Sequence, residues 1–125
     1  MTDFDQFRTE IDKFRRTAED EASYLKEPFV VLERLSELYR SLDERYRAAA
    51  DGIFSDWLLS DDESRRFDAI ALIRRFEVRS AVPRLRELAD RLATRSGPGP
   101  KFERQKVEKL IDVLTAADTL HGQTE

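Results

Sequence analysis

Few side chains in this sequence have the types and spacing that catalysis requires. The chain has no cysteine and one histidine, His121, close to its last residue. A general base needs an ordered partner to orient it, so we do not expect His121 to act as a base or a ligand. Asp61, Asp62 and Glu63 offer oxygen ligands to a hard cation, but acids in the first turn of a helix are explained more simply by the helix dipole. The sequence therefore predicts no catalytic, metal-ligating or cofactor-binding residues, and we expect a protein that is not an enzyme.

Two further motifs that suggest ligand binding have simpler structural explanations. The Gly-Pro-Gly-Pro segment at 97–100 lacks the pattern of a phosphate-binding loop, and its prolines remove N–H donors. Trp57 could stack on a ligand or a base. Because it lies between Phe54 and Leu58, we predict instead that it belongs to the core.

Arginines are the side chains best suited to binding. Residues 65–95 contain 9 arginines and 4 acids, a balance of +5. Guanidinium groups bind carboxylates and phosphates through two parallel hydrogen bonds. Arg84, Arg91 and Arg95 lie seven and eleven positions apart, which places them along one side of a helix, beside its apolar face. The alternative is a solvated stripe paired with acids. The predicted partner-binding residues are Arg75, Arg79, Arg84, Arg91 and Arg95.

The composition is typical of a soluble helical protein. Of the 125 residues, 40% are hydrophobic and 38% charged, with four glycines and four prolines. This length suits one domain with its own core. No apolar run approaches the roughly 20 residues that cross a bilayer. The N-terminal residues have neither the basic start nor the apolar centre of a signal peptide. We therefore expect a cytoplasmic protein that does not bind a membrane.

The charge is unevenly distributed along the chain. The net charge is −4, yet residues 1–64 carry 9 Lys and Arg against 17 Asp and Glu, a balance of −8. The acidic first half and the arginine-rich middle either attract each other within the fold or face different partners.

Apolar residues recur at spacings of three and four, which predicts five or six helices and no strand. Pro28 should begin the second helix, which we expect to continue to about Asp51 and to stop at Gly52. Ser41 and Glu44 form a capping-box pattern that favours a break instead.

The second half has clearer boundaries. The helix at about 61–76 is apolar over much of its circumference, through Phe67 among others, which predicts that neighbours cover it on more than one side. Ser80 should cap the next helix and place Pro83 in its first turn. The last helix should bury Phe102. We predict one domain over residues 1–120, made of a helical hairpin (1–59), a helix pair (61–95) and a C-terminal helix (101–119), followed by a flexible tail (121–125).

Residues 61–92 resemble a HEAT-type helical repeat. The matching positions are Asp61 or Asp62, Arg66, Ala69, Leu72 and Ile73 in the first helix, and Ala81-Val82-Pro83, Leu85 and Leu88 in the second. Between them the sequence reads Glu-Val-Arg-Ser at 77–80, where the family's bacterial members often have a glycine-containing turn. One repeat cannot bury its own faces. The resemblance implies an all-α compact bundle, or a short α-α superhelix, that serves as a binding scaffold.

These observations predict a non-enzymatic protein–protein interaction module, a monomer or small oligomer, that binds an acidic partner surface. A protein partner is favoured over a nucleic acid because the whole chain is acidic. The alternative is a nucleic-acid-binding helical module that uses the arginines of residues 65–95. The small size and acidic balance would suit an immunity or adaptor protein of a bacterial toxin system.

Overall fold

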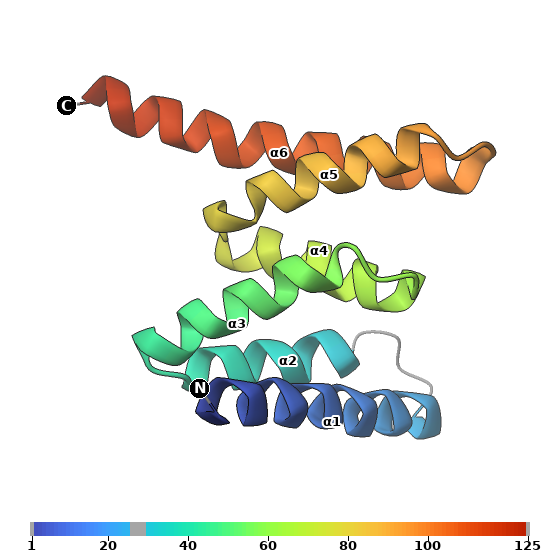
Figure 1. Cartoon of the computed structure of the whole chain (residues 1–125), viewed down its shortest axis with the longest axis vertical. Coiled ribbons are helices and arrows are strands. Elements are labelled where there is room, and N and C mark those ends of the chain that lie inside the picture. The colour runs from blue at the N-terminus through green and yellow to red at the C-terminus, as the bar shows by residue number, and fades with distance from the viewer. Residues whose placement is uncertain (1, 26–29, 125) are drawn as a thin grey trace. The chain divides into compact units, whose positions relative to one another are not determined.

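The fold is all-α, as the sequence predicts (Figure 1). The computed structural model describes the backbone of residues 2–25 and 30–124 and the side chains of 4–20 and 30–116, and these residues form no strand. None of the described helices is both long enough and apolar enough to span a membrane. The elements are α1 (Thr2–Leu25), α2 (Val30–Ser41), α3 (Glu44–Trp57), α4 (Glu63–Phe76), the 3-10 helix η1 (Arg79–Ala81), α5 (Val82–Ala93) and α6 (Pro98–Thr124).

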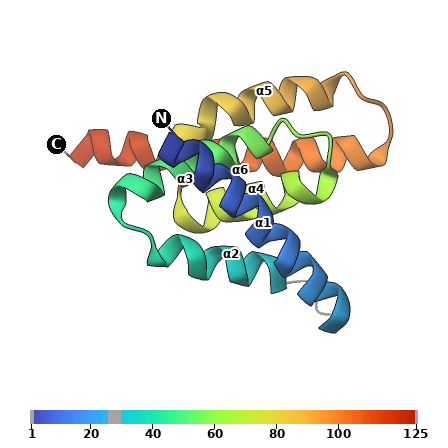
Figure 2. The ribbon, with the colours of Figure 1, turned by 60° about the horizontal axis from the view of Figure 1, so that its bottom comes forward.

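The chain divides into two compact units, residues 1–53 and 54–125, and the division falls inside α3. In the first unit α1 and α2 run side by side, and in the second α5 and α6 are the most closely packed helices (Figures 1 and 2). The single domain predicted for residues 1–120 stays a prediction. α6 runs to Thr124, five residues past its predicted end and into the predicted tail at 121–125, whose side chains lie outside those described. Pro28 lies outside the described residues.

The core of the first unit is built from one side of each helix. Its buried apolar residues are Phe7, Ile11, Ala18, Val31, Leu35, Tyr39, Ala50 and Ile53. The Tyr46 ring meets Phe4 and Phe7 edge-on, with ring centroids 5.8 and 5.0 Å apart. One turn after Ile11 the buried position on α1 belongs to Arg15, which pairs with Glu19.

The continuous helix predicted through Asp51 is wrong. α2 ends at Ser41 and α3 begins at Glu44. The Asp43 carboxylate accepts the Tyr46 backbone N–H at 3.0 Å and so caps the start of α3. Gly52 lies within α3 rather than at its end. The local cap therefore prevails over an apolar stripe that continues across the break.

Two side-chain contacts hold α3 against α2 after this break. Arg47 donates to the carbonyl oxygens of Tyr39 at 3.3 Å and Arg40 at 2.9 Å, in the last turn of α2. The Tyr39 hydroxyl donates to the Asp51 carboxylate at 2.9 Å. Burial, with the Asp51 hydrogen bond and charge, raises the pKa of Tyr39 to about 12. Burial also raises the pKa of Asp51, an effect that the bond from Tyr39 opposes.

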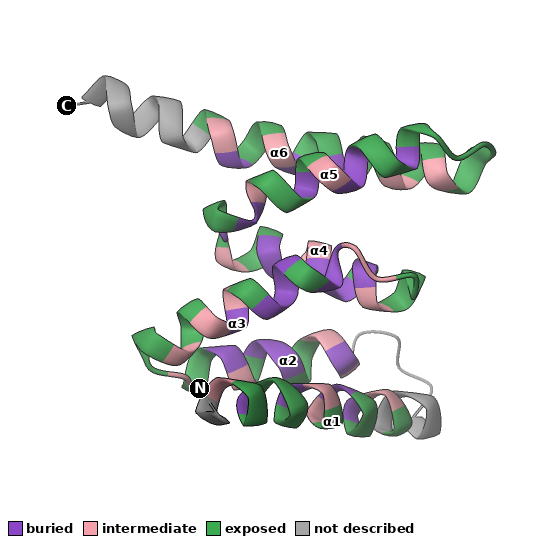
Figure 3. Cartoon of the chain, viewed as in Figure 1, coloured by how far each residue is buried: buried purple, intermediate pink, exposed green. Residues whose placement is uncertain are grey.

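The second unit begins with the end of α3. Phe54, Trp57 and Leu58 are buried there, and the first two rings lie 5.3 Å apart between centroids. Figure 3 shows buried and exposed positions alternating along α4, α5 and the described part of α6. The other buried apolar residues of this unit are Ala69, Leu72, Ile73, Val78, Ala81, Leu85, Leu88, Ala89, Leu92, Val107, Leu110 and Leu114.

Two aromatic residues depart from the predicted burial. Phe67 on α4 is 50% exposed and Phe102 on α6 is 59% exposed. The prediction that neighbours cover α4 on this side is wrong, and so is the burial of Phe102. Periodicity places both residues near an apolar stripe, but it does not tell which edge of the stripe another helix covers.

Glu77 ends α4 in the left-handed conformation, with a φ of 51°. The N–H of Val78 bonds back to the carbonyl oxygen of Ile73 at 3.0 Å, the bond of a Schellman motif, in which glycine is the usual left-handed residue. The Glu-Val-Arg-Ser segment thus makes the turn without a glycine.

Pro83 lies in the first turn of α5, as predicted. Ser80 does not cap that helix: it lies within η1, and Ala81, which precedes α5, makes no side-chain capping bond. α6 begins at Pro98, three residues earlier than predicted, because proline needs no N–H partner in a first turn.

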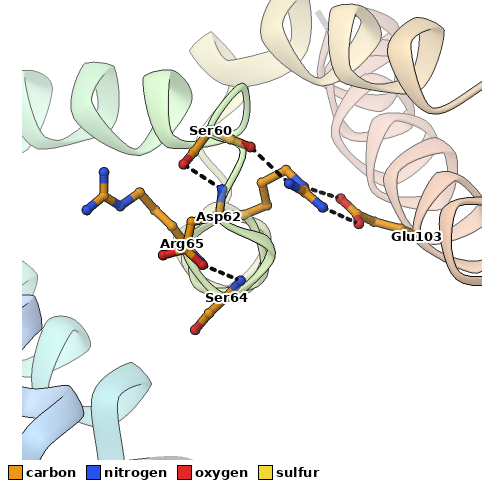
Figure 4. A network of polar contacts seen from close by, with 6 residues as sticks. Ser60, Asp62, Ser64, Arg65 and Glu103 are labelled. Atoms are coloured by element: carbon orange, nitrogen blue, oxygen red, sulfur yellow. Dashed lines mark hydrogen bonds and ion pairs between the residues drawn. The ribbon is translucent and has the colours of Figure 1, made fainter. Parts of the chain in front are cut away.

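α4 is capped by Asp62. The Asp62 carboxylate accepts the backbone N–H groups of Ser64 at 3.0 Å and Arg65 at 3.4 Å (Figure 4). The Ser60 hydroxyl in turn accepts the N–H of Asp62 at 3.1 Å. Asp62 therefore caps the helix, and Glu63 lies in its first turn, where the helix dipole favours an acid.

Arg66 joins the α3–α4 loop, α4 and α6. Its guanidinium makes two bonds to the Glu103 carboxylate, at 2.8 and 3.1 Å, and one to the carbonyl oxygen of Ser60, at 2.9 Å (Figure 4). The side chains of Arg66 and Glu103 are 7% and 17% exposed. Bidentate pairs of this kind are among the stronger polar contacts in proteins.

We predict that Glu103→Ala lowers the free energy of unfolding by about 2–4 kcal/mol, because it leaves the buried Arg66 without its partner. The matched control is Glu108→Ala on the same helix. It removes an ion pair with Arg104 whose side chains are 46% and 50% exposed, so it should cost at most about 1 kcal/mol. Urea unfolding followed by circular dichroism measures both. Equal losses in the two variants would contradict a structural role for the Arg66 pair.

We predict that Tyr39→Phe lowers the free energy of unfolding by about 1–2 kcal/mol at pH 7, since Asp51 loses a hydrogen-bond donor. The folded-state pKa of Tyr39, about 12, lies above the ordinary value of 10.0. The wild-type advantage should therefore be complete below pH 10 and shrink as the pH rises through 12.

Tyr46→Phe is the control for this pH dependence. Urea titrations of the three proteins between pH 7 and pH 12 test the prediction. A difference between wild type and Tyr39→Phe that stays constant over this range would show that the Tyr39 phenol does not carry it.

Candidate binding surface

Three of the predicted arginines form one exposed side of α5, here named the α5 arginine surface: Arg84, Arg91 and Arg95. α5 ends at Ala93, and the backbone N–H of Arg95 bonds to the Leu92 carbonyl oxygen at 3.1 Å, so the turn continues past the helix end. The neighbouring side of α5, with Leu85, Leu88 and Leu92, is buried. The arginines therefore project from a helix that is anchored in the core.

Sequence reasoning missed an acid within this surface. Glu87 accepts from Arg84 at 3.0 Å and from Arg91 at 3.4 Å, and the three side chains are between 43% and 50% exposed. The spacings of three and four residues, which bring helical side chains together, would have shown it. Exposed pairs add little to stability. Because Glu87 contacts both arginines, it orders the two guanidinium groups and lowers the local positive charge, and all three side chains stay exposed.

Arg75 and Arg79 lie on a different element from the other three. Arg75 is in the last turn of α4 and Arg79 begins η1, and both are exposed. The structure thus brings Arg84 and Arg91 together through Glu87, and it places Arg75 and Arg79 on the connection that leads into α5.

The acids at 61–63, Trp57 and His121 were considered above for catalysis, metal binding or ligand stacking. Within the described part of the chain, no group of three or more His, Cys, Asp or Glu side chains is arranged to hold a metal ion. Asp61 and Glu63 are exposed beside the cap. Trp57 is 4% exposed, as predicted for a core residue, with the Arg65 guanidinium 5.8 Å from its ring centroid. His121 lies outside the described side chains.

An open groove of about 450 Å³ lies in the first unit, between α1, α2 and the start of α3. Two of its lining residues, Gln6 and Glu10, bond to each other at 3.3 Å. The remaining lining residues are Phe7, Leu38, Leu42 and Tyr46.

No family model, curated protein or solved structure matches this chain. The HEAT-type resemblance of residues 61–92 therefore stays a prediction from the residues. In the structure that segment covers α4, η1 and most of α5, the part of the chain that carries the arginines.

Proposed function

We propose that this chain is a non-enzymatic protein-interaction module that binds an acidic surface of a partner protein. The contact would be made by the α5 arginine surface, with Arg75 and Arg79 as flanking contacts. The observation that carries the proposal is the exposure of Arg84, Arg91 and Arg95 on one side of a helix whose other side is fixed in the core. A rigid support lowers the entropy lost when the guanidinium groups bind carboxylates.

Glu87 favours a protein partner over a nucleic acid. Each phosphate contact gains affinity from an uncompensated positive charge, and Glu87 offsets part of the charge of Arg84 and Arg91. A protein surface that carries both acids and hydrogen-bond donors accommodates this mixed pattern better than a uniformly anionic backbone does. On this proposal, residues 61–92 act as a HEAT-like scaffold, and the whole chain acts as an adaptor or immunity protein.

We predict that changing Arg84, Arg91 and Arg95 together to Glu abolishes partner binding and leaves the fold intact, because exposed charges contribute only about 0–1 kcal/mol per pair. Affinity capture from lysate with quantitative mass spectrometry measures the binding, and circular dichroism the folding. Arg86→Glu is the control, since Arg86 is exposed on another side of α5.

The outcomes of this experiment separate the alternatives. Proteins retained by wild type and Arg86→Glu but lost from the triple variant support the proposal. Loss of helicity in the triple variant would instead assign the arginines to internal packing. Tight binding to duplex DNA that falls steeply with added salt would assign the surface to nucleic acid.

Glu87→Gln should act in the opposite direction. It removes the acid between Arg84 and Arg91, so we predict an affinity for an acidic partner about two- to fivefold higher, with stability changed by at most about 1 kcal/mol. Titration of the captured partner by calorimetry measures it. A weaker complex would mean that the ordering of the guanidinium groups by Glu87 matters more than the net charge.

A further inference from the structure

A second exposed surface, of different chemistry, lies on α4 and α6. Phe67 of α4 and Phe102 of α6 are 50% and 59% exposed. The Lys106 ammonium lies 5.7 Å from the Phe67 ring centroid and 4.7 Å from that of Phe102. Both distances fall within the roughly 6 Å over which a cation is attracted to an aromatic face. One lysine therefore bridges two large apolar side chains that remain open to solvent.

The arrangement is fixed by its neighbours in the sequence. Phe67 directly follows Arg66, and Phe102 directly precedes Glu103. The buried bidentate pair between Arg66 and Glu103 holds the two backbones in place. The two rings thus flank the ion pair that joins α4 to α6, and this contact limits how far they can move apart.

The surface continues along α6. Phe102, Lys106, Lys109 and Val113 follow one another at spacings of four, three and four residues, so they share one side of the helix within an arc of about 60°. All four are exposed, and Val113 is 49% exposed. The stripe is about 16 Å long, or three helical turns. We name Phe67 together with this stripe the phenylalanine–lysine surface.

Within the described residues, the exposed large apolar side chains are Phe67, Phe102 and Val113, and all three belong to this surface. Single exposed apolar residues are common, but here Phe67 and Phe102 share the lysine Lys106 and Val113 lies on the same side of α6, a grouping that favours an interaction site. The lysines restrict its occupant. A second copy of this chain would bring its own Lys106 and Lys109 against these lysines, and the like charges would repel. An acidic partner would neutralise them.

We propose that the phenylalanine–lysine surface docks an acidic amphipathic helix of a partner protein. Apolar side chains of that helix pack against Phe67, Phe102 and Val113. Carboxylates beside them pair with Lys106 and Lys109. A stripe of three turns matches helix recognition through apolar residues spaced at i, i+3 or i+4, and i+7. This surface shares no residue with the α5 arginine surface, and the proposal does not depend on it.

The test is a selection of displayed random sixteen-residue peptides on the immobilised full chain. The expected outcome is enrichment of peptides with Leu or Phe at helical spacing and Asp or Glu between them. Synthetic copies of these peptides should bind in a fluorescence anisotropy assay. Phe102→Ala and Lys106→Glu should each weaken binding at least tenfold.

Two matched variants control for non-specific charge effects. Arg104→Glu reverses a charge on another side of α6, and Arg91→Glu reverses one on the α5 arginine surface; both residues are exposed. Neither should change peptide affinity more than about twofold, since neither lies on the stripe. If Phe102→Ala disturbs folding, Lys109→Glu carries the test, because its exposed side chain can be changed without touching the core.

The proposal is overturned by enrichment of basic or wholly apolar peptides, by no enrichment, or by acidic peptides that bind every variant equally. Sedimentation of the wild-type chain as a dimer that Phe102→Ala converts to a monomer would also overturn it, by assigning the surface to a second copy.

Discussion

The bidentate contact between Arg66 and Glu103 is the buried polar interaction that joins the start of α4 to α6. Two charged groups removed from water lose much hydration, which is recovered only when nearly all of their hydrogen bonds are satisfied. Here the guanidinium makes two bonds to Glu103 and one to the carbonyl oxygen of Ser60. The contact therefore fixes a geometry as well as a distance: it sets where α6 crosses the start of α4. An apolar pair in the same place would hold α4 and α6 together but, lacking directional hydrogen bonds, would not fix their relative orientation.

The same contact explains why exposed aromatic rings are found beside it. A helix junction held by a directional polar pair does not need the flanking residues for cohesion. Phe67 and Phe102 are thereby left exposed, and the Lys106 ammonium lies near both rings. The second unit thus shows two cationic chemistries: planar guanidinium groups ordered by an acid on α5, and an ammonium held over rings on α6.

Most helices could be predicted from the sequence because apolar spacing and local caps agree. Pro83 and the exposed arginines of α5 follow from such local rules. Where two local signals compete, as between the apolar stripe and the Ser41–Glu44 pattern, periodicity alone gave the wrong answer. A side-chain cap, here from Asp43, starts a new helix without interrupting the apolar stripe. The exposure of Phe102 could not be predicted from the sequence, for another reason. It depends on Glu103 meeting a residue 37 positions away, and no spacing rule along α6 contains that information.

The burial of Trp57 has a spectroscopic consequence. The one tryptophan of the chain belongs to residues 54–125, while all three tyrosines fall within residues 1–53. Trp57 is 4% exposed, against the Phe54 ring and near the Arg65 guanidinium, so its emission should change strongly when that environment opens. Excitation selective for tryptophan then reports on the second unit, and tyrosine emission on the first. The chain carries its own pair of fluorophores for showing whether its two units melt together or in succession.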